Sequence, residues 1–475
     1  MTSQDHGESE SRRGVARSAT TIAVATAASR SLGLVRVAAI TAVLGTTYLG
    51  NTFQASNSVS NVVFELLAAG ALSAVLVPTF VRLIVDGEQE EAERVAGALW
   101  GLSLAVLGSL ALLGALAAPA IASVLTASVN EEAIAAPQRE LATYLLRWFM
   151  PQIPLYALGA IATAVLHAHR KFLAAAVAPI GNTIAVVGAM AAFRWLGGSP
   201  DHWLSLDASE KIALGVGGTA GVAAFVAIPA LALRSTGFRL RPRLDFGSDA
   251  FRKLLPIAGW GVGLHMGAGM LLGAAIVVGN GVEGGVVAYQ VALMCFLVPY
   301  AVLGQSIHTA VLPELSAHGA RNDIAAVWRD VKWGLRRMIL LLGPASVAVA
   351  ALAGPVLRSV PLGEAGTAGS ELIAAALIGL SAGLLPYSAF FLLARGFYAV
   401  HDARTPAFAA VGASGIGTAV MLLAGGAFDG RAKVLSMGLA HSLSYTIGAS
   451  LLAVVLRHRV LVHGHVPGGV YGVPT

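Results

Sequence analysis

The stretch Ser29-Arg30-Ser31-Leu32-Gly33-Leu34-Val35-Arg36 places two arginines inside the first long apolar segment of the chain. A cation at bilayer depth costs several kcal/mol, about 3 by the lower estimates, so it normally faces a cavity, a partner or an anionic ligand. We therefore expect Arg30 and Arg36 to point into a helix bundle rather than into lipid. These two residues are also the first candidates for an anion-binding site.

The composition around this stretch is that of a membrane protein. Of the 475 residues 56% are hydrophobic and only 12% are charged, with a mean hydropathy of +0.75. Soluble domains are about 25% charged. The predicted fold class is an all-α polytopic membrane protein with about 12 transmembrane helices. The predicted spans are residues 17–44, 52–83, 94–125, 140–166, 172–196, 211–233, 252–279, 284–315, 333–358, 370–400, 406–427 and 433–456.

Basic residues predict the orientation. Of the 31 Lys and Arg, about two thirds fall in segments that are cytoplasmic if both termini lie inside. The net charge of +6 follows from this bias and does not indicate a nucleic-acid partner. We expect a multi-pass membrane protein with both termini in the cytoplasm and no cleavable signal before the first span. Its predicted parts are a disordered tail at 1–16, an N-lobe at 17–239, a linker at 240–251, a C-lobe at 252–460 and a tail at 461–475.

The two halves share a pattern. Residues 155–168 match 386–399 at a constant offset of 231, and Leu76-Val77-Pro78 matches Val311-Leu312-Pro313. Six spans return the chain to the same side of the membrane, so such a repeat is parallel, with a pseudo-twofold axis along the membrane normal. The alternative is that alanine-rich helices resemble each other by chance.

Polar side chains in the second span define a candidate cavity surface. Gln54, Asn57 and Asn61 are three and four residues apart and share one face of a helix, which Glu65 continues. Glu65 is a candidate counter-ion for one of the two arginines, a proton or cation coupling site, or a carboxylate that faces the cytoplasm. The spacing does not decide between these roles.

The two arginines of the first span fit an anion with two charged groups. They lie about 9 Å apart along an ideal helix and about 240° apart around it, so a break at Gly33 is needed to turn both inward. Planar guanidinium groups bind phosphates and carboxylates bidentately, which suits a diphosphate or a phosphate–carboxylate pair. The alternative is that one arginine pairs with Glu65 and the other reaches the lipid headgroups.

Other intramembrane polar residues receive structural explanations. Arg147 and Arg395 lie near span ends, from which they can extend to the interface. Four polar residues in spans of the second half are expected to make interhelical hydrogen bonds: His265, Gln290, Gln305 and His308.

No enzyme, metal or cofactor is expected. The single cysteine, Cys295, excludes an intramolecular disulfide, and the twelve histidines show no metal-ligand spacing. No nucleophile–base pair stands out in any span or loop.

Several motifs resemble the MurJ (MviN) lipid II flippases of the multidrug/oligosaccharidyl-lipid/polysaccharide exporter superfamily. The resemblance is dense over 29–83 and returns at 312–316. Its motifs are residues 29–36, Leu44-Gly45, Asn51 with Phe53, Ser60-Asn61 and 70–78.

The resemblance implies a protein of the bacterial plasma membrane with two six-helix lobes around a central cavity, which work by alternating access. The membrane potential is the expected driving force of transport, and no coupling ion is identified. The family's cavity arginines fall on Arg30 and Arg36, and its second-span asparagine falls on Asn61. The implied function is transport of an undecaprenyl-diphosphate-linked peptidoglycan precursor from the inner to the outer leaflet, in cell-wall biogenesis and cell shape. The implied partners are the lipid-linked anionic precursor, the membrane and cell-wall synthesis proteins.

In this hypothesis the two first-span arginines hold the diphosphate, and Gln54, Asn57 and Asn61 bind sugar or peptide. One alternative is a flippase for another polyprenyl-linked oligosaccharide. A second, from a different class, is a cation or drug antiporter. Such an antiporter requires an acidic, aromatic-lined cavity, and the two arginines argue against it.

Overall fold

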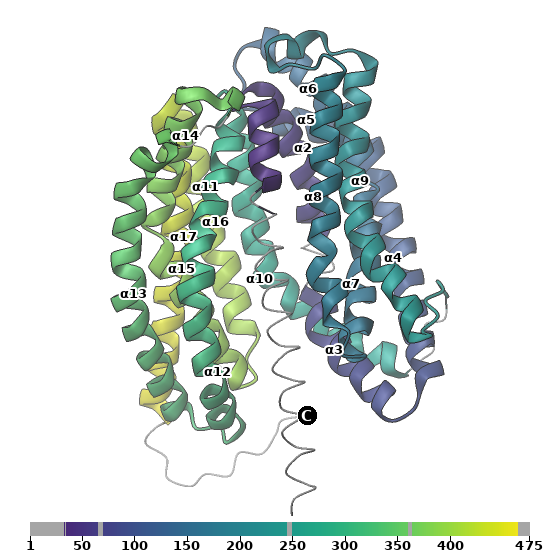
Figure 1. Ribbon diagram of the computed structural model, residues 1–475. Helices are drawn as coiled ribbons and strands as arrows, with labels where there is room; N and C mark the ends of the chain where they lie inside the picture. Colours follow the sequence, from purple (N-terminus) through teal and green to yellow (C-terminus); the bar gives the residue numbers. More distant parts are fainter. Residues whose placement is uncertain (1–32, 34, 65–69, 245–248, 360–362, 464–475) are drawn as a thin grey trace, which may run out of the picture. The chain divides into compact units, whose positions relative to one another are not determined.

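The computed structural model describes residues 33, 35–64, 70–244, 249–359 and 363–463. Every regular element among them is a helix (Figure 1), which confirms the predicted all-α class. The chain divides into two compact units. Unit 1 holds the described residues up to Thr126, Glu131–Gly259 and the short segment that ends at Glu364; unit 2 holds Ala127–Asn130, those from Trp260 and those from Ala365 onward. The predicted tail at 1–16 lies outside the described residues, and the predicted lobe and linker boundaries stay predictions.

Helices follow one another closely along the chain in both units. After an apolar helix at Val35–Leu44, unit 1 contains α2 (Tyr48–Phe64), α3 (Gly70–Val85), α4 (Gln89–Leu116), α5 (Ala118–Leu125), α6 (Glu132–Phe149), α7 (Gln152–Ala168), α8 (Phe172–Trp195), η2 (Pro200–Ser205), α9 (Ala208–Ala232) and η3 (Leu233–Thr236). Then follow α10 (Asp249–Asn280), α11 (Gly285–Pro299), η4 (Tyr300–Gly304), α12 (Gln305–Ala320), α13 (Ile324–Ser359), η5 (Gly363–Ala365), α14 (Gly366–Ser381), α15 (Leu384–Ala399), α16 (Arg404–Ala427) and α17 (Gly430–His463).

The helices have the length and composition of membrane spans. Among the described residues eight helical stretches can cross a membrane, or nine if the bent pair α14–α15 is one span. The first, second and seventh predicted spans coincide with shorter apolar helices, at Val35–Leu44, Leu76–Val85 and His265–Asn280. The chain is therefore a multi-span membrane protein, and its helices are compatible with twelve spans.

Apart from 52–83, which covers α2 and α3 and the residues between them that are not described, four predicted spans are each built from two helices. These are 94–125 (α4 and α5), 140–166 (α6 and α7), 284–315 (α11 and α12, joined by the π-helical η4) and 370–400 (α14 and α15, bent by 46°). Proline explains three of the breaks, because Pro119, Pro151 and Pro299 lie beside them and lack a backbone donor.

Close contact between α8 and α9 depends on glycine. A Cβ at Gly217 would overlap the Cβ of Ala189, and one at Gly221 would lie 2.7 Å from Cγ2 of Val186. On another face of α9, a Cβ at Gly218 would overlap the ring of Phe149 in α6. Small residues let membrane helices approach this closely, so α9 packs tightly against two neighbours in unit 1.

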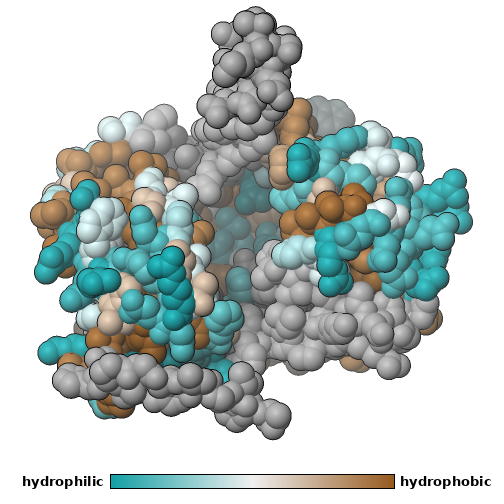
Figure 2. Space-filling model, turned by 90° about the horizontal axis from the view of Figure 1, so that it is seen from below, coloured by the Kyte–Doolittle hydropathy of each residue, from teal (hydrophilic) through white to brown (hydrophobic). Residues whose placement is uncertain are grey.

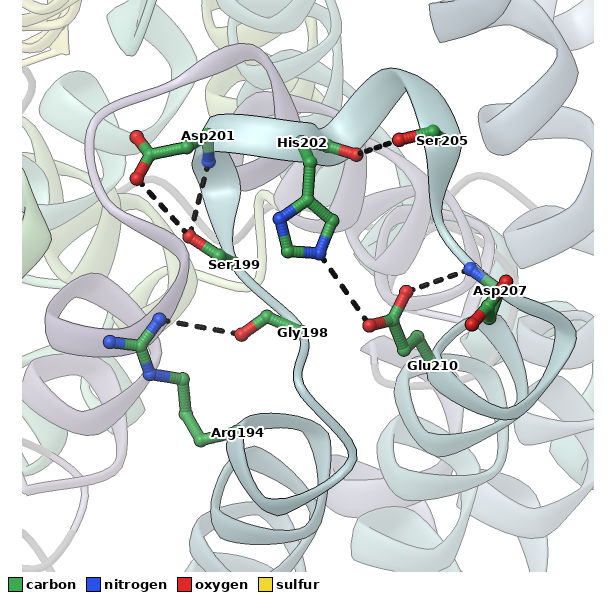
Figure 3. Close-up of polar contacts among 8 residues, drawn as sticks. All are labelled: Arg194, Gly198, Ser199, Asp201, His202, Ser205, Asp207 and Glu210. Carbon is green, nitrogen blue, oxygen red and sulfur yellow. Dashed lines mark hydrogen bonds and ion pairs between the residues drawn. The ribbon is translucent and has the colours of Figure 1, made fainter.

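The loop between α8 and α9 is held by a polar network (Figure 3). The buried carboxylate of Glu210 accepts a hydrogen bond from the backbone N of Asp207 at 2.7 Å and lies 3.6 Å from Nε2 of His202. Together with the Asp207 side chain it forms a capping box at the start of α9. The ring of Trp203 in the same loop lies 6.0 Å from that of Tyr48, which anchors the loop on the start of α2.

In unit 2, a glycine and a serine hydroxyl of α17 allow this helix to pack closely against α14. A Cβ at Gly438 in α17 would lie 2.6 Å from the carbonyl oxygen of Ala376 in α14. The hydroxyl of Ser442 donates to the carbonyl oxygen of Gly379 at 2.7 Å, near the break between α14 and α15. A broken helix in a membrane frees backbone groups that need new partners. Ser442 therefore stabilises the break from the neighbouring helix.

Two pairs of turns support the predicted repeat. After α7, Arg170 adopts a left-handed conformation with φ 58°, and after α15, His401, 231 residues later, has φ 60°. After α3, Gly87 has φ 78°, and after α12, Asn322, 235 residues later, has φ 54°. Non-glycine residues rarely adopt positive φ. Its recurrence at the offsets of the two sequence matches favours a parallel repeat over chance similarity.

The turn after α15 is also fixed by an ion pair. One carboxylate oxygen of Asp402 accepts hydrogen bonds from Nη2 of Arg459 at 2.7 Å and from Oγ1 of Thr405 at 2.6 Å. The other accepts from the backbone N of Thr405 at 3.0 Å. Burial alone would raise the pKa of Asp402, but the hydrogen bonds from Thr405 and Arg459, with the charge of Arg459, outweigh it and lower the pKa below its ordinary value.

We predict that Asp402→Asn lowers the stability of unit 2 by about 1 kcal/mol at pH 7. Because the folded pKa is depressed, the carboxylate stabilises the fold above the unfolded pKa of about 4, and the effect is lost as the pH falls through the folded value. Thermal unfolding of the purified protein at pH 7 and at pH 3 measures this. Glu371→Gln, at an exposed carboxylate at the start of α14, is the control and should leave the midpoint unchanged. An equal loss for Asp402→Asn at both pH values would contradict the prediction.

Candidate functional site

Four of the predicted site residues lie in the described part of the chain and two do not. Arg36 lies on the Val35–Leu44 helix, and Gln54, Asn57 and Asn61 lie on α2. Arg30 and Glu65 lie outside the described residues, so their roles stay predictions.

Arg36 is a cation held by a neutral partner. Its Nη1 donates to Oδ1 of Asn182 in α8 at 3.2 Å, and its Nε is buried without a hydrogen-bond partner. Within the described residues no carboxylate forms an ion pair with this guanidinium. A desolvated charge without a counter-ion attracts an anion strongly, because little water screens the interaction. The site therefore has the electrostatic character of an anion-binding site.

Asn182 owes its position to the close approach of α8 and α9. Its Oδ1 lies 3.1 Å from the place that a Cβ of Gly221 would take, and Val186, one turn further on, lies against the same glycine. A larger residue at 221 would displace the amide that orients Arg36. Gly221 is thus a positioning residue for the site.

The polar face of α2 is organised by Gln152, which is fully buried at the start of α7. Its Nε2 donates to Oδ1 of Asn57 at 3.3 Å and to Oγ1 of Thr219 in α9 at 3.4 Å. Its Oε1 accepts from the hydroxyl of Ser60 at 2.8 Å. Asn57 therefore connects α2 to α7, and through Gln152 to α9.

The remaining two residues of this face differ in environment. Asn61 is half-buried and donates from Nδ2 to the backbone oxygen of Asn57 at 3.3 Å, within its own helix. Gln54 is buried, at 6% exposure. In the described part of the chain no hydrogen bond joins Arg36 to Gln54, Asn57 or Asn61. The prediction that these amides bind cargo is not tested by these contacts.

The partners of the predicted residues were not among the residues that the sequence singled out. Asn182, Gln152 and Thr219 are hydrogen-bonding residues inside apolar helices, which is a functional signal in a membrane protein. That signal was present in the sequence. Which helix each of these side chains faces depends on how the helices pack, and the residues next to it in the sequence do not determine that.

A second half-buried cation lies in unit 2. Nη1 of Arg395 lies 2.7 Å from Nδ1 of His308, and Nε2 of His308 lies 3.0 Å from the backbone oxygen of Ser388. Both contacts fit a neutral imidazole that carries its proton on Nε2, because arginine only donates. The interhelical hydrogen bond predicted for His308 is confirmed. The expectation that Arg395 extends to the interface is wrong, since its guanidinium turns inward to His308.

Among the described residues no group of three or more His, Cys, Asp and Glu is arranged to hold a metal ion.

Most of the chain matches a known protein family. The model of a family described as lipid II flippase MurJ matches residues 40–467. The probable lipid II flippase MurJ of Haemophilus influenzae is 27% identical over 398 residues, which is 80% of this chain and 74% of that relative.

Solved structures share the fold. The lipid II flippase MurJ in an inward closed conformation aligns with a TM-score of 0.72 at 18% identity, over 92% of this chain and 87% of that one. A multidrug resistance MATE family transporter of the MOP superfamily, in an inward-facing conformation, aligns with a TM-score of 0.70 at 13% identity, over 91% and 95%. At these identities the likeness concerns the fold alone.

We predict that Gly221→Ala lowers stability by about 1–3 kcal/mol, because the new Cβ meets Val186 and Asn182. Adding Val186→Ala removes the closest contact and should restore much of the loss. Gly188→Ala is a matched control, since no atom lies within 4 Å of its Cβ position. The measurement is the thermal unfolding midpoint in detergent. A full loss that persists in the double variant would contradict the packing explanation.

Proposed function

The chain belongs to the lipid II flippase MurJ family, and from this membership we propose that it moves lipid II, an undecaprenyl-diphosphate-linked peptidoglycan precursor, from the inner to the outer leaflet of the bacterial plasma membrane. Transport proceeds by alternating access, with both termini in the cytoplasm. The cargo implies cell-wall synthesis proteins as partners that use the precursor once it is outside.

The observation that carries the proposal is the half-buried guanidinium of Arg36, whose Nε is buried without a partner and which has an amide and no described carboxylate beside it. A diphosphate supplies the missing negative charge and accepts hydrogen bonds in a bidentate geometry. Arg30, six residues earlier, is proposed to bind the second phosphate. Gln54, Asn57 and Asn61 are proposed to bind sugar or peptide groups, and Glu65 to act as counter-ion or coupling group.

The membrane potential favours the outward direction. An inside-negative membrane drives an anion outward with about 2.3 kcal/mol per charge per 100 mV. A diphosphate with one or two uncompensated charges therefore gains a few kcal/mol. If the arginines move with the cargo that gain shrinks, and the potential instead resets the empty carrier, because it draws cations inward. No cofactor is proposed.

Another polyprenyl-linked oligosaccharide would satisfy the same diphosphate site and remains the alternative cargo. A cation or drug antiporter is less well supported. Unit 2 does contain an aromatic-lined pocket, with Phe390, Phe391 and Tyr445, but no carboxylate is among its lining residues. Arg36 would also repel a cationic drug from unit 1.

We predict that Arg36→Ala reduces outer-leaflet lipid II at least about tenfold, the effect of losing charged hydrogen bonds. Asn182→Asp should match it without a change of shape, because a carboxylate beside Arg36 neutralises the charge that the cargo needs. The assay is rescue of a strain depleted of its own lipid II flippase, with outer-leaflet lipid II measured in the same cells.

The control is Arg239→Ala, at an exposed arginine after α9, and it should transport like the wild type. Equal membrane levels of all variants are required. Failure of a well-expressed wild type to rescue would reject lipid II as the cargo. Full transport by both Arg36→Ala and Asn182→Asp would retain the flippase but reject the anion site.

A further inference from the structure

A cavity of about 610 Å³ lies between α12 and the first turns of α13, within unit 2. Its lining includes three basic side chains from α13, which are Arg329, Lys332 and Arg336. They lie at positions i, i+3 and i+7 and so share one face of the helix. The α12 side contributes Glu314 among others. This cavity is separate from the residues proposed to bind the cargo.

The charge balance inside the cavity is positive. Asp330, one of its two acidic residues, is already paired with Nδ1 of His318 at 2.7 Å. Within the described part of the chain no carboxylate forms an ion pair with Arg329, Lys332 or Arg336. Three exposed cations therefore face one remaining carboxylate, that of Glu314.

An aromatic side chain indicates the level in the membrane at which the cavity lies. Trp333 also lines it, is 45% exposed, and its ring lies 4.1 Å from the guanidinium carbon of Arg337. Tryptophan is enriched at membrane–water interfaces, where an apolar ring and a polar edge are both satisfied. Further along α13 the exposed residues become apolar, with Leu340 at 72% and Val347 at 70%.

Figure 2 looks onto the end of the molecule at which α12 joins α13, and hydrophilic side chains gather there on unit 2, at the left of the view. The exposed residues of α13 are thus mostly basic up to Arg337, with Trp333 among them, and mostly apolar from Ile339 onward. That order matches the passage from headgroup region to hydrocarbon. The cavity therefore lies at the level of the lipid phosphates, on the side of the membrane that the charge pattern predicts to be cytoplasmic.

We propose that the α12–α13 cavity binds the phosphate headgroup of an anionic phospholipid. Arg329, Lys332 and Arg336 bind the phosphate, Trp333 covers the glycerol region, and the acyl chains follow the apolar face of α13. A phospholipid is favoured over a soluble anion because the basic face continues directly into exposed apolar surface. Basic pockets between transmembrane helices on the cytoplasmic side bind such headgroups.

The test titrates the full-length protein in a neutral detergent with dihexanoyl-phosphatidylglycerol, dihexanoyl-phosphatidylcholine or inorganic phosphate, and counts bound molecules by native mass spectrometry. We expect the protein to prefer phosphatidylglycerol. Each basic side chain strengthens such binding about fivefold, so a variant with Arg329→Gln, Lys332→Gln and Arg336→Gln should bind about 100-fold more weakly. If the triple variant does not fold, the three single substitutions replace it, each with a loss of about fivefold.

The matched control carries Arg234→Gln, Arg239→Gln and Arg241→Gln, which remove three exposed charges outside the cavity. It should retain wild-type preference. Three results would overturn the proposal: equal weakening by the control, equal binding of phosphatidylcholine, or binding of inorganic phosphate as tight as that of phosphatidylglycerol. The first indicates a general surface effect, the second a non-ionic lipid contact, and the third a site for soluble anions.

Discussion

The cost of an unpaired charge in a membrane governs the described polar interior of this protein. Arg36 and Arg395 are both held by neutral groups, an asparagine amide and an imidazole. Neutral partners satisfy donor hydrogens but leave the charge in place. A carboxylate would have been the stronger partner, and its absence beside Arg36 in the described residues keeps that cation available for an anion. The proposed transport function depends on this difference.

Polar groups inside the bundle find hydrogen-bond partners only where two helices lie close together, and glycine allows that close approach. Asn182 lies beside Gly221 in α9, and Ser442 reaches the backbone of α14 beside Gly379. Lipid supplies no hydrophobic force between helices, so packing and buried hydrogen bonds must hold them together. The same short distances that bring hydrogen-bonding groups together leave no room for an added methyl group. In unit 1, the geometry of the site therefore depends directly on the close packing of α8 and α9.

The predicted repeat could be recognised in the sequence because each of its matches is local. Each match covers one helix and its turn, and the turn conformation follows from the residues beside it, as at Arg170 and His401. The positions of the helix breaks were harder to predict from the sequence. Proline indicates where a helix loses a donor, but the bend between α14 and α15 also involves the approach of α17 at Ser442. Such a contact has no trace in the sequence around the break.

The sequence by itself determined the membrane class, the approximate positions of the spans and Arg36 as a cation inside an apolar segment, because hydropathy and periodicity follow from the order of residues along the chain. Only the tertiary structure decided that Asn182 holds Arg36, that Gln152 connects Asn57 to Thr219, and that Arg395 turns to His308. These pairs join residues that are 67 to 146 positions apart. Choosing a partner over such a distance depends on which helix faces pack together, and an apolar helix surface offers many equivalent faces until its neighbours are in place.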